Sequence, residues 1–220
     1  AGKGIAARGA GCGAARRSGR FCSFVPGFAA AHGHGLHAEI HCAAKGVKTV
    51  ENAQAHAKRL ILVNGPMGVG KTAVCRQLVR LCAPAAFLDG DWCWMLEPFT
   101  VTPETKELVL SNIAHMLESY GRCTACRTVV FCWVMQTPDI VQQVLGRLPA
   151  GLFSPRLITL MASPEALAAR VQKDVDARLR GADALARALC YREKYAWAPC
   201  TVDTTHLSPG EAAAAVLAAL

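Results

Sequence analysis

Short apolar runs alternate along the chain with longer segments in which an apolar residue recurs every third or fourth position. The short runs predict buried strands, and the longer segments predict amphipathic helices. One run, Thr128–Val134, is apolar at almost every position, which is typical of a strand buried on both faces. The predicted strands are Leu60–Val63, Ala86–Leu88, Thr128–Val134, Leu157–Met161 and Thr201–Asp203.

Helices are predicted between these strands, and several begin at residues that favour a helix start. Thr102 is a good N-cap, and Pro103 suits the first helical position. A polar, arginine-rich stretch over residues 173–187 interrupts the apolar pattern. The predicted helices are Ala73–Cys82, Thr102–Tyr120, Pro138–Leu148, Ala166–Val175, a helix that ends near Trp197, and a last one opened by Ser208.

Strands that alternate with helices predict an α/β fold with a parallel sheet and right-handed crossovers. Ligands are then expected at the carboxyl ends of the strands. The 220 residues suffice for one well-buried domain, which we assign to residues 60–220. Residues 1–59 are rich in Gly, Ala, Arg and His and show no sustained period, so we expect a disordered, low-complexity extension.

The N-terminal segment carries almost all of the net charge of +8. Residues 1–59 contain nine Lys/Arg and two acidic residues, whereas the rest of the chain contains fifteen and fourteen. A nearly neutral body argues against a basic nucleic-acid-binding face. The segment is expected to be a non-functional extension, with an organellar transit peptide as the alternative. Its cluster of His32, His34, His37, His41 and Cys42 is not expected to bind a metal, because low-complexity sequence fixes no geometry.

Eleven cysteines suggest free thiols in a reducing compartment, because several lie in predicted strands or helix faces. The pair Cys123 and Cys126 has no second pair, so a metal or redox role is disfavoured. No apolar run approaches the length of a membrane span. A cytoplasmic location is therefore expected, or an organellar one if residues 1–59 are a transit peptide.

The segment Gly65–Thr72 fits the phosphate-binding pattern G-x-x-x-x-G-K-[ST] and lies between a predicted strand and a predicted helix. Backbone N–H groups of such a loop point at phosphates, Lys71 reaches the β- and γ-phosphates, and the Thr72 hydroxyl ligates Mg²⁺. The context favours a nucleoside triphosphate site over a chance glycine-rich turn. The predicted nucleotide-binding residues are Gly65, Met67, Gly68, Val69, Gly70, Lys71, Thr72 and Ala73.

Asp89-Gly90-Asp91 directly follows the strand after this loop. Carboxylates at a strand end can support Mg²⁺ or accept a proton from an attacking hydroxyl. If the strand continues, Asp89 and Asp91 point to the same side. We assign Asp89, with Thr72, to the metal and Asp91 to the base, against the alternative of an ordinary acidic turn.

The third strand lacks the aspartate that often follows such a strand in P-loop ATPases, since Cys132-Trp133-Val134 stands there. This disfavours a motor or AAA-type ATPase and places the metal and the base on the acidic pair. Aromatic residues are expected near the same end of the sheet, where they either stack on the acceptor or form core, two alternatives that we weigh equally. The predicted substrate-binding residues are Asp91, Trp92 and Trp133.

The arginine-rich stretch supplies further catalytic candidates, Arg178 and Arg180. Mobile arginines stabilise the charge that spreads over a transferring phosphoryl group, and a position late in the chain suits a closing lid. The alternative is a solvated helix face, because Asp174 and Asp176 are interleaved and can pair with the arginines.

Taken together, the phosphate loop, the Leu88–Asp91 string and the late arginines resemble the small P-loop kinases, such as gluconate, adenylylsulfate, shikimate and chloramphenicol kinases. The strings Asn64–Thr72 and Leu88–Trp92 also resemble bacterial nucleotide kinase-like proteins. The resemblance implies a five-stranded sheet of order 2-3-1-4-5, an arginine-bearing lid, and Mg-ATP as donor. It also implies that the acceptor lies over the Asp91 side and that residues 203–206 lie beside the adenine.

The leading hypothesis is an ATP-dependent phosphotransferase that moves the γ-phosphate of Mg-ATP to a small-molecule hydroxyl or a nucleotide. One alternative is an ATP-binding regulatory module without significant turnover, and another is a polynucleotide kinase that acts on RNA ends. The acidic pair and the arginines count against the first alternative, and the nearly neutral body counts against the second. Neither a nucleic acid nor a membrane is an expected partner, and a monomer or homodimer is expected.

Overall fold

The structure is a computed structural model that describes residues 57–220. Its five strands form one parallel sheet in the order β2-β3-β1-β4-β5, which confirms the predicted α/β fold and strand order. The predictions for residues 1–56, including the prediction for the histidine cluster, concern a part of the chain outside the described residues. The strands are β1 Lys58–Asn64, β2 Ala85–Asp89, β3 Thr128–Cys132, β4 Phe153–Met161 and β5 Thr201–Asp203.

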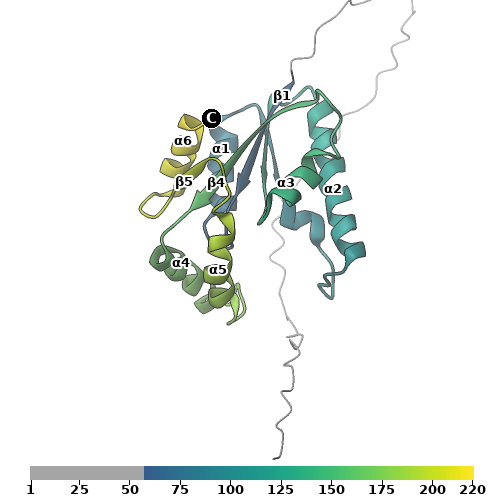
Figure 1. Cartoon of the computed structure of the whole chain (residues 1–220). Coiled ribbons are helices and arrows are strands. Elements are labelled where there is room, and N and C mark those ends of the chain that lie inside the picture. The colour runs from purple at the N-terminus through teal and green to yellow at the C-terminus, as the bar shows by residue number, and fades with distance from the viewer. Residues whose placement is uncertain (1–56) are drawn as a thin grey trace, which may run out of the picture. The chain divides into compact units, whose positions relative to one another are not determined.

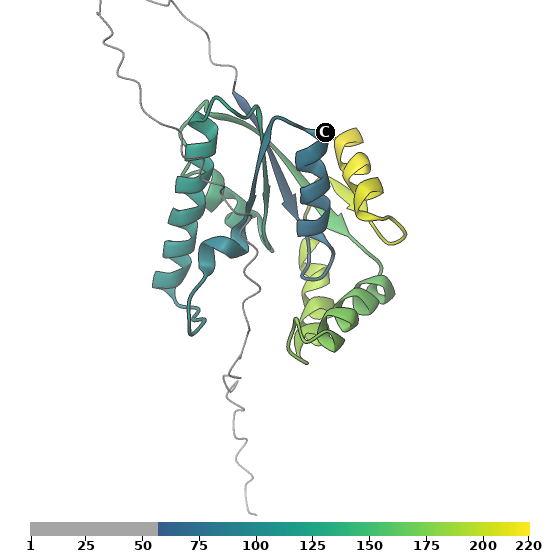
Figure 2. The ribbon, with the colours of Figure 1, turned by 180° about the vertical axis from the view of Figure 1, so that it is seen from behind.

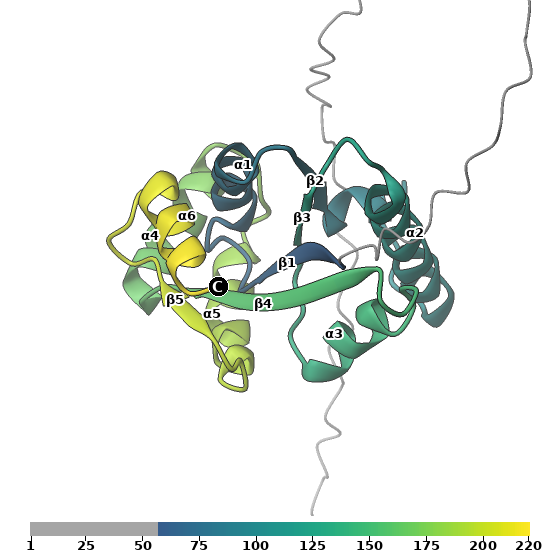
Figure 3. The ribbon, with the colours of Figure 1, turned by 90° about the horizontal axis from the view of Figure 1, so that it is seen from above.

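Helices cover both faces of the sheet and make a three-layer arrangement (Figures 1 and 3). In both views α2 and α3 lie on one face, and α1 and α6 lie on the other together with α4 and α5; Figure 2 shows the same layers from behind. None of the described helices is long and apolar enough to cross a bilayer. The helices are α1 Lys71–Leu81, α2 Pro103–Arg122, α3 Pro138–Leu145, α4 Pro164–Asp176, α5 Ala184–Arg192 and α6 Pro209–Ala218, with short 3-10 helices η1 Gly90–Trp94 and η2 Glu193–Tyr195.

Strand β1 is buried on both faces because it divides two hydrophobic clusters. Leu60 and Leu62 belong to the cluster shared with α2 and α3, whereas Ile61 and Val63 belong to the cluster shared with α1 and α6. Successive side chains of a strand point to opposite faces, so a strand between two helical layers needs apolar residues at every position. This explains why the run Leu60–Val63 shows no alternation.

Several boundaries differ from the sequence prediction, among them three at β3, α3 and β4. Strand β3 ends at Cys132 rather than Val134, and α3 ends at Leu145 rather than Leu148. Strand β4 begins at Phe153 instead of Leu157, because its first residues pair with β1 from Lys58 onward. Pro155 is tolerated there, since β5 pairs only with the last residues of β4 and leaves the other edge free of ladder bonds.

The buried side chain of Asn64 joins three chain segments at the carboxyl end of β1. Its Nδ2 donates to the Met135 carbonyl (2.9 Å) and to Thr159 Oγ1 (3.4 Å), and its Oδ1 accepts from the Met135 N–H (2.9 Å). Thr159 belongs to β4, and Met135 follows β3. A single amide therefore ties the ends of the central strands together beneath the loop that follows β1.

Replacing Asn64 by alanine is expected to lower the free energy of unfolding by about 2–4 kcal/mol, because it leaves the buried Met135 N–H without its partner. Urea denaturation followed by circular dichroism measures the change. The control is Asn112→Ala, since Asn112 is exposed and its Nδ2 donates only to the Cys93 carbonyl (3.1 Å). Equal losses in the two variants would contradict the structural role assigned to Asn64.

Candidate active site

The glycine-rich loop Gly65–Thr72 connects β1 to α1 and ends in the first turn of that helix. Gly70 is the N-cap of α1 and has no side chain to occupy the first N–H groups of the helix. Helix N-termini with free N–H groups and a positive dipole end bind anions. The loop therefore presents backbone donors at the carboxyl end of the central strand, as the sequence predicted.

The loop is pressed against β4 and α4 so closely that two of its positions require glycine. A Cβ on Gly68 would lie 2.3 Å from Val171 Cγ2, and Gly68 has a φ of +83°. A Cβ on Gly65 would lie 2.5 Å from the Leu160 carbonyl oxygen. Leu160 presents a backbone atom, the Val171 side chain is fully buried, and both glycines have a positive φ, so these glycines fix the path of the loop.

Lys71 folds back over the loop, where its Nζ donates to the carbonyls of Gly65 (2.9 Å) and Pro66 (3.0 Å). Burial lowers the pKa of Lys71, and the nearby acidic groups of Asp91 and Asp89 oppose that effect. An anion in the loop would favour the charged form further. The lysine can exchange its carbonyl partners for phosphate oxygens without leaving the loop.

The two motifs of the sequence meet in a hydrogen bond between Thr72 and Asp89. Thr72 Oγ1 donates to Asp89 Oδ2 (2.7 Å), and Asp89 Oδ1 accepts from the Asp91 N–H (3.1 Å). Hydroxyl and carboxylate oxygens are ligands that suit Mg²⁺. No group of three or more His, Cys, Asp or Glu among the described residues could hold a metal by itself. The donor set fits a cation that keeps waters and phosphate oxygens as its other ligands.

Asp91 does not continue the strand, so strand alternation, which was expected to hold only if the strand continued, does not relate its direction to that of Asp89. Strand β2 ends at Asp89, and Gly90–Trp94 turns into the 3-10 helix η1. Asp91 is the more exposed carboxylate of the pair. Desolvation of its carboxyl group raises its pKa, Asp89 adds to the rise, and Lys71, Arg180 and Trp133 act in the opposite direction.

Trp133 follows β3 and packs against the backbone of the acidic turn. It is 9% exposed, and a Cβ on Gly90 would lie 2.5 Å from its Cγ. Trp92, by contrast, is 52% exposed and meets Phe87 edge-on at a centroid distance of 5.3 Å. Of the two predicted substrate-binding tryptophans, Trp133 is therefore a support for the turn and Trp92 is open to a ligand.

The arginines of the late stretch occupy different environments. Arg180 donates its Nε to Asp174 Oδ2 (2.8 Å), and it is also close enough to Asp91 to lower the pKa of that carboxyl group. Arg178 is exposed and has a φ of 56°. Arg180 is thus bonded to Asp174 within reach of the Asp91 charge, and Arg178 lies at the surface of the α4–α5 connection.

Arg170 has a role that the sequence did not reveal. Its guanidinium donates to the carbonyl of Val69 (3.1 Å) in the phosphate loop and to the hydroxyl of Thr204 (3.1 Å). It also donates to the carbonyls of Thr204 and Thr205 in the loop after β5. Arg170 is thus a fixed link between two loops at the same end of the sheet, not a mobile arginine. Its partners are distant in sequence, so no local pattern could have indicated it.

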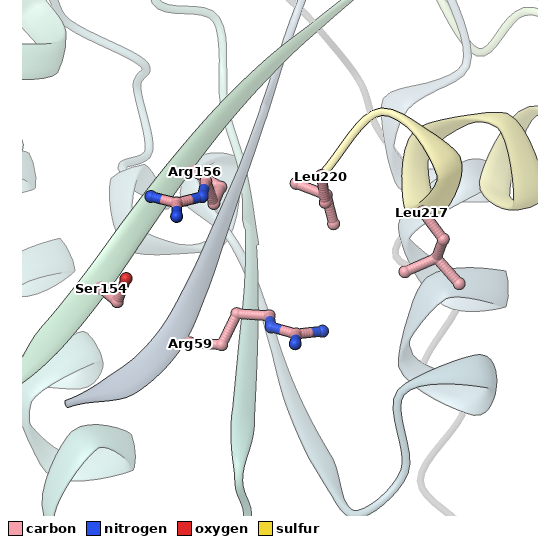
Figure 4. Close-up of a pocket in the computed structure, with 5 residues that line it drawn as sticks. All are labelled: Arg59, Ser154, Arg156, Leu217 and Leu220. Atoms are coloured by element: carbon pink, nitrogen blue, oxygen red, sulfur yellow. The ribbon is translucent and has the colours of Figure 1, made fainter. Parts of the chain in front are cut away.

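A cavity of about 310 Å³ lies away from this site, at the amino-terminal end of the sheet (Figure 4). It is lined by Arg59 of β1, Ser154 and Arg156 of β4, and Leu217 and Leu220 near the chain end. In Figure 4 the two guanidinium groups extend in different directions. The cavity shares no residue with the phosphate loop or the acidic turn, so we do not assign the chemistry to it.

A glycine-rich loop between the central strand and the first helix of a parallel sheet of this order defines a P-loop nucleotide-binding fold. A family model described as an AAA domain matches residues 61–184, which is more than half of the chain. The chain belongs to this family. The resemblance to the P-loop kinase group is confirmed at the level of family and fold.

Solved structures, among them two that are named as kinases, share the fold at low sequence identity. A gluconokinase from Sinorhizobium meliloti 1021 superposes with a TM-score of 0.57 at 20% identity, covering 74% of this chain and 91% of its own. A sugar kinase from Janibacter sp. HTCC2649 gives 0.55 at 16% identity, with coverages of 74% and 94%. The tunicamycin resistance protein of Deinococcus radiodurans gives 0.55 at 15% identity, with coverages of 73% and 94%. None of the curated proteins searched matches the chain.

The sequence disfavoured an AAA-type ATPase, yet the family whose model matches residues 61–184 is described as an AAA domain. The feature behind that expectation is nevertheless present, because β3 ends at Cys132 and Trp133 follows it. The carboxylates nearest the phosphate loop therefore come from the end of β2, which pairs with β3 at Asp89 and Cys132.

Replacing Gly90 by alanine is expected to displace Trp133, because the added Cβ would overlap its ring. The variant should lose about 1–3 kcal/mol of unfolding free energy and change the tryptophan emission of the native protein. Gly210→Ala is the matched control, since a Cβ there meets nothing within 4 Å. Chemical denaturation and fluorescence spectra measure both effects, and a Gly90 variant that behaves like the control would refute the packing argument.

Proposed function

We propose that the protein is an ATP-dependent phosphotransferase that moves the γ-phosphate of Mg-ATP to the hydroxyl of a small molecule or to a nucleotide. The observation that carries the proposal is the bond from Thr72 Oγ1 to Asp89 Oδ2 (2.7 Å), with Asp91 following on the adjacent turn. A donor loop and a carboxylate pair in contact form the minimum apparatus for phosphoryl transfer. We assign this activity to a domain over residues 60–220.

Within this proposal the phosphate loop holds the donor. The N–H groups of the loop and of the first turn of α1, from Gly65 to Ala73, cradle the β- and γ-phosphates, and Lys71 exchanges its carbonyl partners for phosphate oxygens. Thr72 and Asp89 would hold Mg²⁺, which when bound neutralises phosphate charge and orients the γ-phosphate. The loop after β5, bridged to Val69 by Arg170, would border the adenine.

Asp91 is the proposed base because it is adjacent to the donor and more exposed than Asp89. Its carboxylate would accept the proton of the attacking hydroxyl. Arg180, already close enough to influence Asp91, would stabilise the charge on the transferring group, and Arg178 on the same connection is the second candidate. Trp92 is the proposed aromatic contact of the acceptor.

Two alternatives differ from this proposal in what the site would need. A regulatory ATP-binding module requires the phosphate loop but no carboxylate beyond the metal ligand, so Asp91 would have no task. A polynucleotide kinase requires a basic path to the site for a nucleic-acid backbone. The acidic turn and the nearly balanced charge from Leu60 onward support a small acceptor instead.

The variant Lys71→Ala is expected to weaken binding of a fluorescent ATP analogue at least about tenfold and to reduce turnover by about 10²-fold or more, because the loop loses its charged phosphate donor. Fluorescence titration and coupled ADP-release assays measure the two quantities. Lys106→Ala removes an exposed lysine on α2 and should change neither. Wild-type turnover in Lys71→Ala would remove the basis for the donor site.

The variant Asp91→Asn is expected to reduce acceptor-dependent ADP release by about 10²-fold or more while leaving ATP affinity within a factor of about two, because the amide accepts no proton. Glu118→Gln makes the same exchange on α2, where Glu118 pairs with Arg122 (2.7 Å), and should be silent. If Asp91→Asn turned over ATP at the wild-type rate, the protein would be better described as a binding module.

A further inference from the structure

The pair Cys123 and Cys126 lies at the end of the sheet opposite the phosphate loop. Cys123 is the C-cap of α2, where its N–H donates to the carbonyls of Ser119 (3.1 Å) and Tyr120 (3.3 Å). A two-residue turn separates it from Cys126, which comes just before β3. Because β3 runs parallel to β1, its first residues lie at the amino-terminal end of the sheet, whereas the phosphate loop follows the carboxyl end of β1.

The two thiols of this pair differ in their access to solvent. Cys123 is exposed, whereas Cys126 is buried and only 8% exposed. The Sγ of Cys126 points back to the end of α2, where it donates to the carbonyl of Tyr120 (3.4 Å) and more weakly to that of Cys123 (3.8 Å). A reagent in solvent can therefore reach the first thiol, while the second thiol lies protected within the same turn.

Lys58, the first residue of β1, holds this turn through its side chain. Its Nζ donates to the carbonyls of Tyr120 (3.0 Å) and Cys123 and to the Sγ of Cys126 (3.8 Å). A single ammonium group thus contacts the backbone of one cysteine and the sulfur of the other. Its three partners lie 62, 65 and 68 residues further along the chain, so no local sequence pattern could show the arrangement.

The turn brings the two cysteines within the range that a disulfide can span. The Cα atoms at the ends of a two-residue turn lie less than about 7 Å apart, and a disulfide joins Cα atoms that are about 4.4–6.8 Å apart. The Cys126 sulfur already lies beside the Cys123 carbonyl. The exposed Cys123 side chain can change rotamer rapidly, so it can turn its sulfur toward that of Cys126.

From these contacts we infer that Cys123 and Cys126 form a thiol–disulfide exchange site that reacts with low-molecular-weight disulfides and is positioned by Lys58. The sequence disfavoured a redox role because the pair stands alone. The structure adds an exposed attacking thiol, a second thiol in the same turn and a lysine that contacts both residues. The site is separate from the phosphate loop, and the inference does not depend on the proposed phosphotransfer.

The exchange takes place in two steps. The Cys123 thiolate first attacks one sulfur of the reagent, the reagent S–S bond breaks, and the other half leaves as a thiolate with the electron pair. The Cys126 thiolate then attacks the Cys123 sulfur of this mixed disulfide, and the second half of the reagent leaves in the same way. The leaving thiolates take up the protons that the two cysteines released to solvent. The protein dithiol loses two electrons in total and the reagent gains them, so no other reactant is needed.

Oxidised glutathione is the probe, and a tryptic peptide of the full chain gives the readout. Cleavage after Arg122 and Arg127 releases residues 123–127, which contain both cysteines and no others. After free thiols are blocked with an alkylating reagent, mass spectrometry separates the glutathione adduct of this peptide from its internal disulfide, which is two hydrogen atoms lighter than the dithiol. Conversion of the adduct to the internal disulfide should be at least about tenfold faster in the native protein than in urea, because the folded turn holds the thiols together.

The exposed Cys190 provides a matched control within the same digest. Cleavage after Arg187 and Arg192 releases residues 188–192, in which Cys190 is the only cysteine. This peptide should accumulate as the glutathione adduct. Cys126→Ser should likewise stop residues 123–127 at the adduct, whereas Cys123→Ser should slow the first step, since only the buried thiol remains.

Variants of Lys58 test whether this residue positions the turn. Lys58→Met should leave the rate of adduct formation on Cys123 within a factor of about two and slow the conversion to the internal disulfide about fivefold or more, and Lys58→Arg should restore most of that rate. A turn that was merely loosened would expose both thiols and accelerate the first step instead. The two rates therefore separate positioning from a general loss of structure, and circular dichroism confirms that each variant is folded.

Three outcomes would overturn the inference: conversion no faster in the native protein than in urea, a first adduct on Cys126 instead of Cys123, or equal conversion rates in the wild type and Lys58→Met. The first two are measured on the unmodified chain, so they remain decisive even if a Lys58 variant does not fold. ADP release takes no part in these measurements, so the outcome leaves the proposed phosphotransfer to its own tests.

Discussion

The hydrogen-bonding of β1 on both sides is the constraint on which the rest of the molecule depends. The strand pairs with β3 along one edge and with β4 along the other, and apolar residues bury both of its faces. A strand held in this way has no freedom to shift its register, because a shift of one residue would turn every side chain to the opposite layer. The loop after Asn64 therefore starts from a fixed point. Because the loop begins there, the end of β1 determines where the glycines, Lys71 and Thr72 lie.

Contacts between loops complete the site that β1 begins. Thr72 reaches Asp89 at the end of β2, and Arg170 joins Val69 to the loop after β5. The donor loop is thereby connected to both outer parts of the sheet through side-chain hydrogen bonds. Partly buried, charge-assisted bonds of this kind hold geometry more firmly than exposed ion pairs do. An anion that enters the loop meets groups whose spacing is already set, which lowers the ordering cost of binding.

The sequence predicted the parts of the molecule that depend on local pattern. Apolar runs located the strands, the spacing of Gly65, Gly70 and Lys71 located the phosphate loop, and the order of elements together with the resemblance predicted the sheet order. The path of the chain after Asp89 depends instead on Trp133, whose ring leaves room only for a glycine at position 90. The partners of Asn64 and Arg170 lie 71 and 34 residues away, and no single-sequence pattern encodes contacts of that kind.

Asp89 and Asp91 differ in burial and in hydrogen bonding because a turn separates them. Asp89 is buried and uses both carboxylate oxygens, one for Thr72 and one for the backbone N–H of Asp91. It therefore cannot take a substrate proton without breaking the contact that joins the two motifs. Asp91 lies in the first turn of η1 and is exposed. A continued strand would have placed the two carboxylates in equivalent positions, whereas the 3-10 turn leaves Asp89 bonded to Thr72 and Asp91 exposed. The same turn thus separates a buried carboxylate that is bonded to the phosphate loop from an exposed one.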